Sequence, residues 1–121
     1  MTTTLNELAK SIRQNAVDHG FWEEDRNFGE MLALIHSEVS EALESYRKGE
    51  PSLFLVHSDD CQIDEFGWCT CTPKPEGWTS EIIDVLIRSL DLLHEQVNID
   101  HVTSLKMKYN TTRPYKHGKK F

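Results

Sequence analysis

The chain has 121 residues, of which 38% are hydrophobic, and its formal net charge is −7 at pH 7. This length suffices for one domain (1–121), whereas the modest hydrophobic content leads us to expect that burial is completed by oligomerisation. The acidic charge argues against a partner that is a nucleic-acid polymer, but it allows a nucleotide substrate because a metal ion can offset acidic side chains locally.

No apolar run approaches the ~20 residues that cross a bilayer. The N-terminal segment lacks the basic start, apolar centre and cleavage site of a signal peptide. The three cysteines, Cys61, Cys69 and Cys71, are an odd number within one short stretch, which does not resemble a disulfide framework. We therefore expect a cytoplasmic protein with no membrane partner.

Two helices are predicted in the first half of the chain. The first covers about 4–18, with Leu5, Leu8, Ile12 and Val17 on one side and Gly20 as the stop signal. The second covers about 27–48 and ends at a glycine, with a proline two residues beyond it. Both helices carry apolar residues at helical spacing, so each should bury one face.

Two further helices are predicted in the second half. The third follows Gly77, where Thr79 or Ser80 can cap it, and continues to about Val97. The fourth begins near Asp100, a good cap residue, and covers about 100–110 before a proline prevents its continuation. The predicted fold is therefore an all-α four-helix bundle.

The segment 51–77 is too long and irregular for a plain connection between helices. Residues 52–57 and 66–72 could pair as a small β-hairpin, so we expect an irregular or hairpin insertion here. Its three cysteines, with His57, could bind zinc. Structural zinc sites more often use CxxC spacings than the CxC found here, which favours reduced thiols in an extended loop.

Glu38 is the most informative acid of the second helix. At ~100° per residue, the residues within roughly 60° of it on the helical projection are Met31, Leu34, Ile35 and Ala42. Glu38 therefore lies inside the apolar stripe, with Glu41 at its edge. Because a buried carboxylate without a partner is costly, Glu38 requires a cation or a hydrogen-bond network.

The third helix has a broad apolar face and a narrow polar stripe, which carries Glu81, Asp84, Arg88, Asp91 and Glu95. By itself this stripe would be an ordinary solvated face. Two antiparallel helices that each offer acids at i and i+3 can, however, converge four carboxylates on one or more hard cations. We therefore predict that Glu38, Glu41, Glu81 and Asp84 bind Mg²⁺, for which Mn²⁺ can substitute.

The sequence Glu38-Val-Ser-Glu41, followed at a distance by Glu81-Ile-Ile-Asp84, resembles the ExxE…ExxD signature of the MazG-like, all-α nucleoside triphosphate pyrophosphohydrolases. The surrounding stretches GFWEEDRNFGEMLALIHSEVSEALESYRKGE, KPEGWTSEIIDVLIRSLDLL and KMKYNTTRPYKHGKK are similar as well, and together they cover most of the chain. Many relatives carry a further Glu directly before the first motif glutamate, where this chain has Ser37. The resemblance therefore extends to all four main acids but not to this auxiliary position.

The resemblance implies a MazG-like bundle that assembles as a homodimer or homotetramer. It also implies Mg²⁺-dependent hydrolysis of a (deoxy)nucleoside triphosphate to the monophosphate and pyrophosphate, for nucleotide-pool editing or house-cleaning, with a purine such as dGTP favoured by resemblance only. Carried over by position, Glu38, Glu41, Glu81 and Asp84 would be the metal ligands, and Glu38 or Glu41 could double as the catalytic base.

The C-terminal segment 106–121 is basic and contains no acid. Lys106, Arg113 and Lys119 suit the phosphates of a substrate, Arg as a bidentate fork and Lys as a point charge. Tyr109 and Asn110 could stack on or hydrogen-bond the base or sugar, and in resembling proteins the KxxYNxxRP stretch lies beside the nucleotide. The plainer interpretation is a frayed basic end.

Other functions fit the same residues. The nearest is an all-α hydrolase of the dUTP or dCTP type. A non-catalytic helical interaction module, with the acids as its partner-binding face, predicts no Mg²⁺ dependence. A zinc-loop regulatory protein built on the cysteines is a third alternative.

Overall fold

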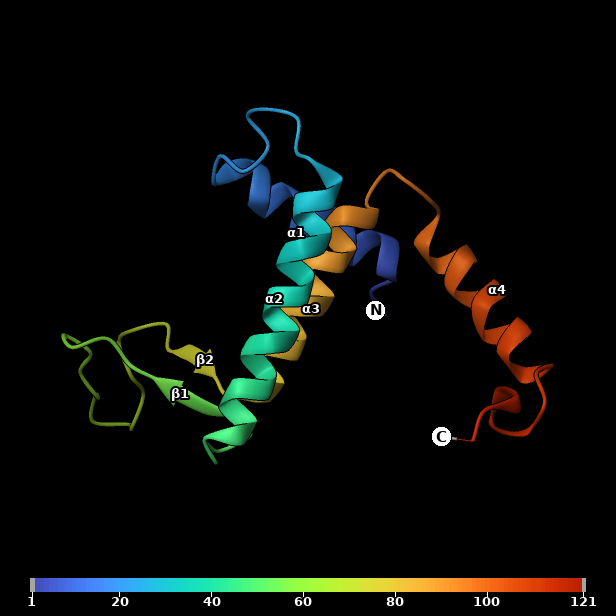
Figure 1. Cartoon of the computed structure of the whole chain (residues 1–121). Coiled ribbons are helices and arrows are strands. Elements are labelled where there is room, and N and C mark those ends of the chain that lie inside the picture. Colours follow the sequence, from blue (N-terminus) through green and yellow to red (C-terminus); the bar gives the residue numbers. More distant parts are fainter. Residues whose placement is uncertain (1, 121) are drawn as a thin grey trace. The chain divides into compact units, whose positions relative to one another are not determined.

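The computed structural model describes residues 2–120. Met1 and Phe121, the two ends of the predicted single domain, lie outside the described residues, and Phe121 is also the last residue of the predicted basic tail. The elements, in chain order, are α1 (Leu5–Asp18), α2 (Phe28–Arg47), β1 (Phe54–Val56), β2 (Lys74–Glu76), α3 (Trp78–Leu93), α4 (Ile99–Thr111) and the 3-10 turn η1 (Tyr115–Gly118) (Figure 1). The predicted mostly helical fold with a small hairpin is therefore confirmed. Residues 27–88 form one compact unit, and residues 2–26 with 89–120 form another, so the boundary falls within α3.

The first two helices begin where the sequence predicts. The Thr4 side chain accepts a hydrogen bond from the Glu7 amide, and the Asn27 side chain accepts one from the Glu30 amide, both at 3.1 Å. Each side-chain oxygen satisfies one of the amides that the first helical turn leaves unpaired. The ends at Asp18 and Arg47 also agree with the predicted ends.

The predicted cap of the fourth helix is wrong. Asn98, not Asp100, caps α4, because its side chain accepts from the His101 amide at 3.1 Å. The Asp100 carboxylate instead accepts from the amides of Leu5 at 2.9 Å and Asn6 at 3.2 Å. An acid placed there satisfies the first amides of α1 and complements the positive end of that helix, so Asp100 ties the starts of α1 and α4 together.

The third helix is shorter than predicted and starts differently. It ends at Leu93 rather than near Val97, since Glu95 adopts a left-handed conformation with φ of 65°. Thr79 and Ser80 do not cap it. The Thr79 hydroxyl donates to the Ser52 carbonyl at 2.6 Å and the Ser80 hydroxyl donates to the Pro75 carbonyl at 3.0 Å, so both fasten the helix start to the preceding segment.

The hairpin is real, but its second strand is not at 66–72. Antiparallel pairing joins β1 to β2, with Phe54 opposite Glu76. Residues 66–68 turn instead, because the Asp64 carboxylate accepts from the amides of Phe66 and Trp68, each at 2.9 Å. Such Asx-type bonds offer the backbone an alternative to a strand ladder. The second strand is thereby displaced to Lys74–Glu76.

The unit formed by residues 2–26 and 89–120 has a small apolar core and a buried ion pair. Ala9, Leu90 and Ile99 are buried together, with Leu5 and Ile12 packed against them. Asp91, which the sequence placed on a solvated stripe, is only 6% exposed. Its carboxylate accepts from Arg13 Nε at 2.6 Å and from Trp22 Nε1 at 3.3 Å, with Arg26 at 3.5 Å. Asp91 is therefore a structural acid.

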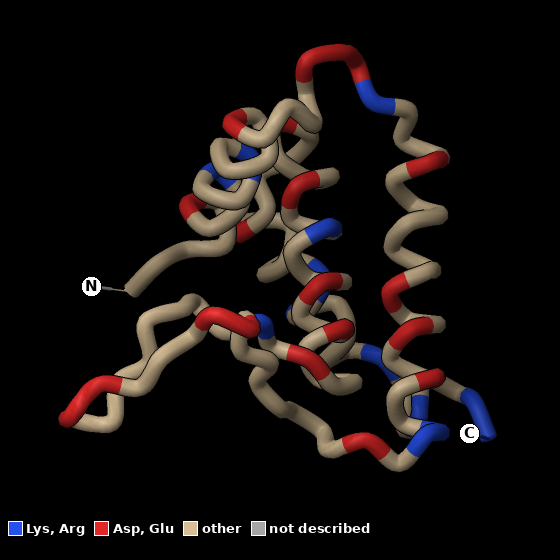
Figure 2. The backbone as a smooth tube through the Cα atoms, turned by 90° about the vertical axis from the view of Figure 1, so that its left-hand side faces the viewer, with Lys and Arg blue, Asp and Glu red and all other residues tan. Residues whose placement is uncertain are grey.

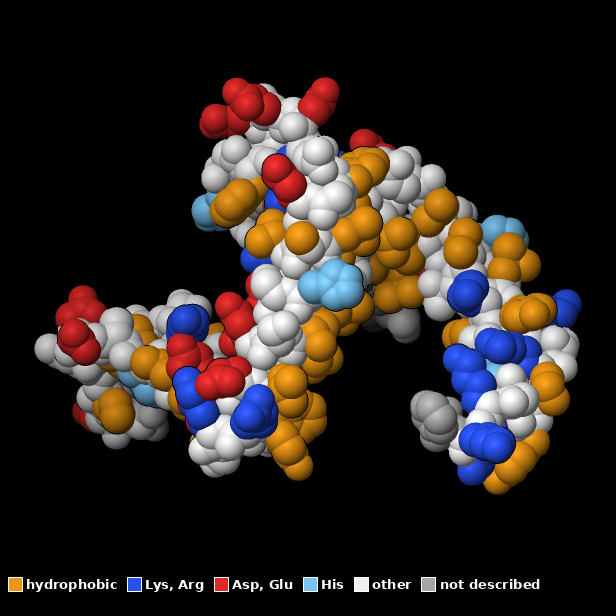
Figure 3. All heavy atoms as spheres, viewed as in Figure 1, with side chains coloured by type: hydrophobic (Ala, Val, Ile, Leu, Met, Phe, Trp, Pro, Cys, Tyr) orange, Lys and Arg blue, Asp and Glu red, His pale blue; other side chains and the backbone are white. Residues whose placement is uncertain are grey.

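In the unit 27–88, α2 buries one face, made of Met31, Glu38, Ala42 and Ser45. Several apolar residues of α3 stay exposed: Ile82, Ile83, Leu86 and Ile87 are 40–53% exposed. The described residues therefore do not bury the broad apolar face expected of a central helix. Figure 3 shows hydrophobic and acidic side chains on opposite sides of the lower part of α2. Oligomerisation that would cover the apolar face stays a prediction.

No helix among the described residues is both long and apolar enough to span a membrane.

Candidate functional site

Three of the four predicted metal ligands lie together in the unit 27–88. One carboxylate oxygen each from Glu38 and Glu41 of α2 and Glu81 of α3 lie within 4.8 Å of one another. Figure 2 shows acidic residues at intervals along the helical parts of the backbone. Asp84, one turn after Glu81, is not part of this group. Burial, followed by the negative charge of Glu38, raises the pKa of Asp84, so it lies within the electrostatic reach of the cluster.

Glu38 is buried, as its position in the apolar stripe predicts, with 7% exposure. Arg88 Nε donates a hydrogen bond to its Oε1 at 2.8 Å. Burial opposes ionisation of Glu38, but hydrogen bonds from Arg88, Glu81 and Glu41 outweigh it and lower the pKa of this carboxyl. Glu38 therefore has the hydrogen-bond network that a buried acid requires, and Arg88 is a site residue that the sequence analysis did not assign.

Glu81 behaves in the opposite way. Burial, the hydrogen bond with Glu38 and the negative charge of Glu41 raise the pKa of Glu81 from 4.5 to about 7. Carboxylates held this close cannot all be charged without a cation or a shared proton. The cluster therefore carries less than its full negative charge near neutral pH, and a divalent cation would relieve the same repulsion.

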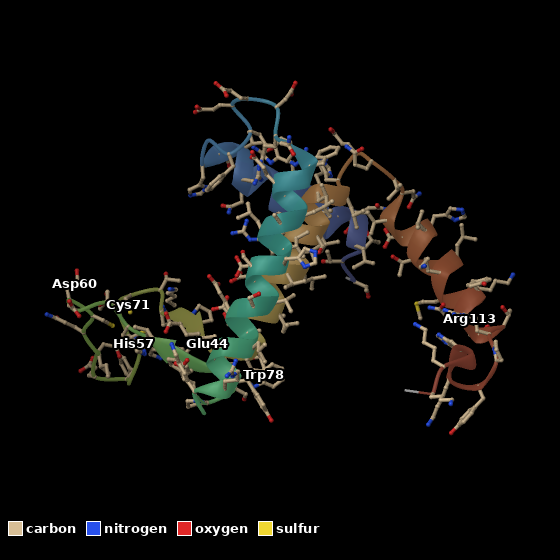
Figure 4. The ribbon with its side chains drawn as sticks, viewed as in Figure 1. Glu44, His57, Asp60, Cys71, Trp78 and Arg113 are labelled. Atoms are coloured by element: carbon tan, nitrogen blue, oxygen red, sulfur yellow. The ribbon has the colours of Figure 1, made fainter. Side chains whose placement is uncertain are left out.

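A pocket of about 330 Å³ adjoins the cluster within the same unit. Its charged lining consists of Glu41, Glu44, Glu50, Glu76, Glu81 and Lys48. In Figure 4 the labelled Glu44 marks the α2 side of this region, next to the hairpin. The volume lies at the lower end of the ~300–1,000 Å³ typical of small-molecule sites. With five carboxylates and one lysine, the pocket repels a free polyphosphate, so an anionic ligand would need a metal ion as its partner.

Ser45 is a second residue that the sequence analysis missed. It lines this pocket, is 8% exposed, and its Oγ has no hydrogen-bond partner among the residues that the structure describes. A buried hydroxyl without a partner is unfavourable and is commonly satisfied by water or a ligand. Ser45 follows Glu38 by two helical turns, so the periodicity that identified Glu38 places Ser45 on the same face.

The predicted substrate-binding residues lie in the other unit. Lys106, Tyr109 and Asn110 belong to α4, Arg113 follows that helix, and Lys119 follows η1. All five are exposed, as Figure 4 illustrates for Arg113. They are therefore accessible to a ligand, and their contacts with a substrate stay a prediction.

A second cluster of ligating side chains lies in the loop between β1 and β2. Ligand atoms of His57, Cys61, Cys69 and Cys71 all lie within 4.8 Å of one another. Figure 4 shows His57 and Cys71 close together in this loop. All three cysteines are free thiols. The sequence favoured reduced thiols in an extended loop, and the structure gathers these free thiols around one histidine.

The described residues form a mostly helical fold with two clusters of ligating side chains, one of carboxylates and one of thiols with an imidazole. No protein-family model, curated protein or solved structure is significantly similar to this chain. The resemblance to MazG-like enzymes therefore rests on the motifs of the sequence.

Proposed function

We propose that this chain is a Mg²⁺-dependent nucleoside triphosphate pyrophosphohydrolase of the MazG-like type. One observation carries the proposal: Glu38, Glu41 and Glu81 come from two helices and converge within 4.8 Å beside a pocket. Glu38 and Glu41 alone could be an ordinary pair on one helix. The addition of Glu81 from α3 makes a three-dimensional carboxylate site at the positions of the two resembling motifs.

The residues fit a hard divalent cation. Carboxylate oxygens are preferred ligands of Mg²⁺, which commonly uses one or two protein carboxylates and completes its octahedron with waters and substrate phosphates. The raised pKa of Glu81 indicates a cluster short of positive charge. Asp84, one turn further along α3, lies outside this group and would be the fourth ligand of the set. When bound, Mg²⁺ would neutralise phosphate charge and polarise a phosphoryl oxygen.

The side chains of this cluster divide into two roles. Arg88 holds Oε1 of Glu38 and favours its charged form, so Glu38 is a weak base and a better ligand. Glu41 is exposed and has no ion pair with Lys or Arg among the described residues, which makes it the better candidate to orient a water and accept its proton. The oxygen of that water attacks the α-phosphorus, the bond to the bridging oxygen breaks, and pyrophosphate leaves.

The substrate assignment rests on the basic segment and on the resemblance. A triphosphate bears about four negative charges, more than a metal ion neutralises by itself. Lys106, Arg113 and Lys119 would supply the remaining positive charge, and Tyr109 and Asn110 would contact the base or sugar. A purine deoxynucleotide such as dGTP is the favoured substrate, and dUTP or dCTP is the nearest alternative.

A screen of the common ribo- and deoxyribonucleoside triphosphates with Mg²⁺ tests this proposal. Pyrophosphate and orthophosphate should be read separately, together with the nucleotide product. The proposal expects pyrophosphate and a monophosphate in a 1:1 ratio from at least one nucleotide. Release of orthophosphate with a diphosphate product would instead indicate cleavage at the γ-phosphorus and would contradict it.

The Arg88–Glu38 bond favours one other candidate, a non-catalytic helical interaction module. Arg88 satisfies the buried carboxylate without any metal, so the cluster could be structural and the acids around it a surface for a basic partner. This alternative expects no thermal shift with Mg²⁺ and nucleotide and no hydrolysis of any triphosphate in the screen.

A further inference from the structure

The loop between β1 and β2 has no apolar core of its own. None of residues 57–73 is buried. Its larger apolar side chains point to solvent, with Ile63 74%, Phe66 78% and Trp68 73% exposed. Segments that bury so little surface usually need a disulfide or a metal to hold one conformation.

The loop nevertheless has defined local structure that converges on its thiols. The Gln62 and Thr70 backbones are joined by a 2.9 Å hydrogen bond, and Ile63 and Cys69 form an isolated antiparallel bridge. The Asp64 amide donates to the Trp68 carbonyl at 2.8 Å. This inner turn brings Cys61, in the segment before the turn, next to Cys69, in the segment after it.

The distances among the four side chains match a tetrahedral metal site. His57 Nδ1 lies 3.3 Å from Cys71 Sγ and 3.7 Å from Cys61 Sγ. Zinc bonds of ~2.0–2.1 Å to nitrogen and ~2.3 Å to sulfur at tetrahedral angles separate nitrogen from sulfur by about 3.5 Å, and two sulfurs by about 3.8 Å. The four ligand atoms, all within 4.8 Å of one another, therefore need only small side-chain movements to enclose an ion.

We propose that His57, Cys61, Cys69 and Cys71 bind one structural Zn²⁺ ion that fixes the loop between β1 and β2. Three thiolates and one imidazole are a known closed ligand set for structural zinc, and thiolate ligands disfavour Mg²⁺ and Ca²⁺. Binding displaces the thiol protons to solvent and leaves no open coordination position. The site is separate from the carboxylate cluster, and it holds whether or not the chain hydrolyses nucleotides.

Metal analysis of the full-length chain, purified under reducing conditions without chelator, tests the proposal first. One Zn²⁺ per chain is expected, with all three thiols protected from a thiol reagent until a zinc chelator is added. Cys71→Ser and His57→Ala should lose most of the zinc, whereas Gln62→Ala, which changes an exposed side chain of the same loop, should keep it. Zinc-free protein with three freely reactive thiols, stoichiometric iron or copper, or a disulfide within the loop would each overturn the proposal.

Proteolysis of the loop provides a second readout that does not depend on metal content. Phe66 and Trp68 are exposed between the ligands Cys61 and Cys69, so they are ready sites for chymotrypsin once the loop opens. Chelation, followed by restoration of Mg²⁺, should accelerate cleavage there at least severalfold while the helical circular dichroism stays unchanged. Equal cleavage rates with and without zinc would show that no metal holds the loop. Glu38→Gln should retain zinc, which separates this test from that of the carboxylate site.

Discussion

Arg88 Nε of α3 donates a hydrogen bond to Glu38 Oε1 of α2 at 2.8 Å. Arg88 thereby places a positive charge beside the Glu38 carboxylate, which interrupts the buried face of α2. The Arg88 side chain is 38% exposed and that of Glu38 is 10% exposed, so the carboxylate depends on this bond more than the guanidinium does. In the proposed enzyme, Arg88 and Mg²⁺ would share the charge of Glu38.

Arg88→Met should therefore destabilise the metal-free protein by about 1–2 kcal/mol, less than for a fully buried pair, because Arg88 is partly exposed. Urea denaturation with and without Mg²⁺ measures this effect. Mg²⁺ should stabilise the variant more than the wild type, since the ion would replace the lost charge. Arg47→Met, at an exposed position near the end of α2, serves as the control and should change stability little. A loss that Mg²⁺ does not reduce would argue that the pair is purely structural.

Substitution of the acids of the cluster should reduce activity far more than substitution of a neighbouring acid. Glu38→Gln and Asp84→Asn should abolish turnover by removing metal ligands, and Glu41→Gln should lower kcat by roughly 10²–10⁴-fold by removing the base. Circular dichroism should show that the helices survive in each variant. Glu44→Gln changes an acid of the same helix and pocket outside the three-carboxylate group, so it should retain activity within a few-fold. Unchanged pyrophosphate release by Glu38→Gln would remove the basis of the assignment.

Binding of Mg²⁺ should release a proton near neutral pH. The pKa of Glu81 is raised to about 7, so much of this carboxyl is protonated below that pH in the metal-free fold. Affinity for Mg²⁺ should rise as pH increases through about 7. By the same linkage, Glu81 makes the metal-free fold less stable as pH rises from 4.5 to about 7, because the folded chain holds a proton that the unfolded chain has lost.

Calorimetric titrations with Mg²⁺ in buffers of different ionisation enthalpy count that proton directly. Release should be clear at about pH 6.5 and nearly absent at about pH 8.5. Glu81→Gln carries no titratable proton at this position and should show little release at either pH. Proton release that does not change between the two pH values would contradict the assigned role of Glu81.

The basic residues of the C-terminal segment should affect substrate affinity more than chemistry. Lys106→Ala and Arg113→Ala are each expected to raise KM by about tenfold, which corresponds to ~1.4 kcal/mol, with a smaller change in kcat. Lys10→Ala, at an exposed lysine of α1, removes the same charge from a position that the proposal does not use. If all three substitutions raise KM equally, the C-terminal segment contributes only general positive charge and does not bind the substrate specifically.

Asp91 should matter for stability and not for metal binding. Its carboxylate pairs with Arg13 and Arg26 in a largely buried setting, so Asp91→Asn should cost about 3 kcal/mol by leaving guanidinium charge without a partner. Glu95→Gln, at a 76% exposed side chain just after α3, should cost far less. Urea denaturation of both variants measures the difference, and an unchanged affinity for Mg²⁺ in Asp91→Asn would separate this acid from the cluster.

The features that local sequence determines were predictable. Asn27 caps α2, and helical periodicity alone places Glu38 on its buried face. The same periodicity could have identified Ser45. The partner of Glu38 could not be found in this way, because Arg88 lies fifty residues further along the chain and meets it only through the packing of α3 against α2.

The errors come from side chains that act outside their own element. Asp100 looks like a cap for α4, yet its carboxylate caps α1. Asp64 bonds to the amides that the predicted strand 66–72 would have needed for pairing. The proximity of the cysteines was likewise not predictable from the CxC spacing, because the turn around Asp64 brings Cys61 to Cys69 and Cys71. Spacing along the chain does not report such contacts.

Product analysis of dGTP, and of the other common triphosphates, incubated with the purified chain and Mg²⁺ tests the proposed pyrophosphohydrolase activity most directly. We predict stoichiometric pyrophosphate and monophosphate from at least one of them, lost on removal of Mg²⁺ and in Glu38→Gln. If no triphosphate is hydrolysed under these conditions, or if hydrolysis persists unchanged in Glu38→Gln, the carboxylate cluster is not the active site of a pyrophosphohydrolase.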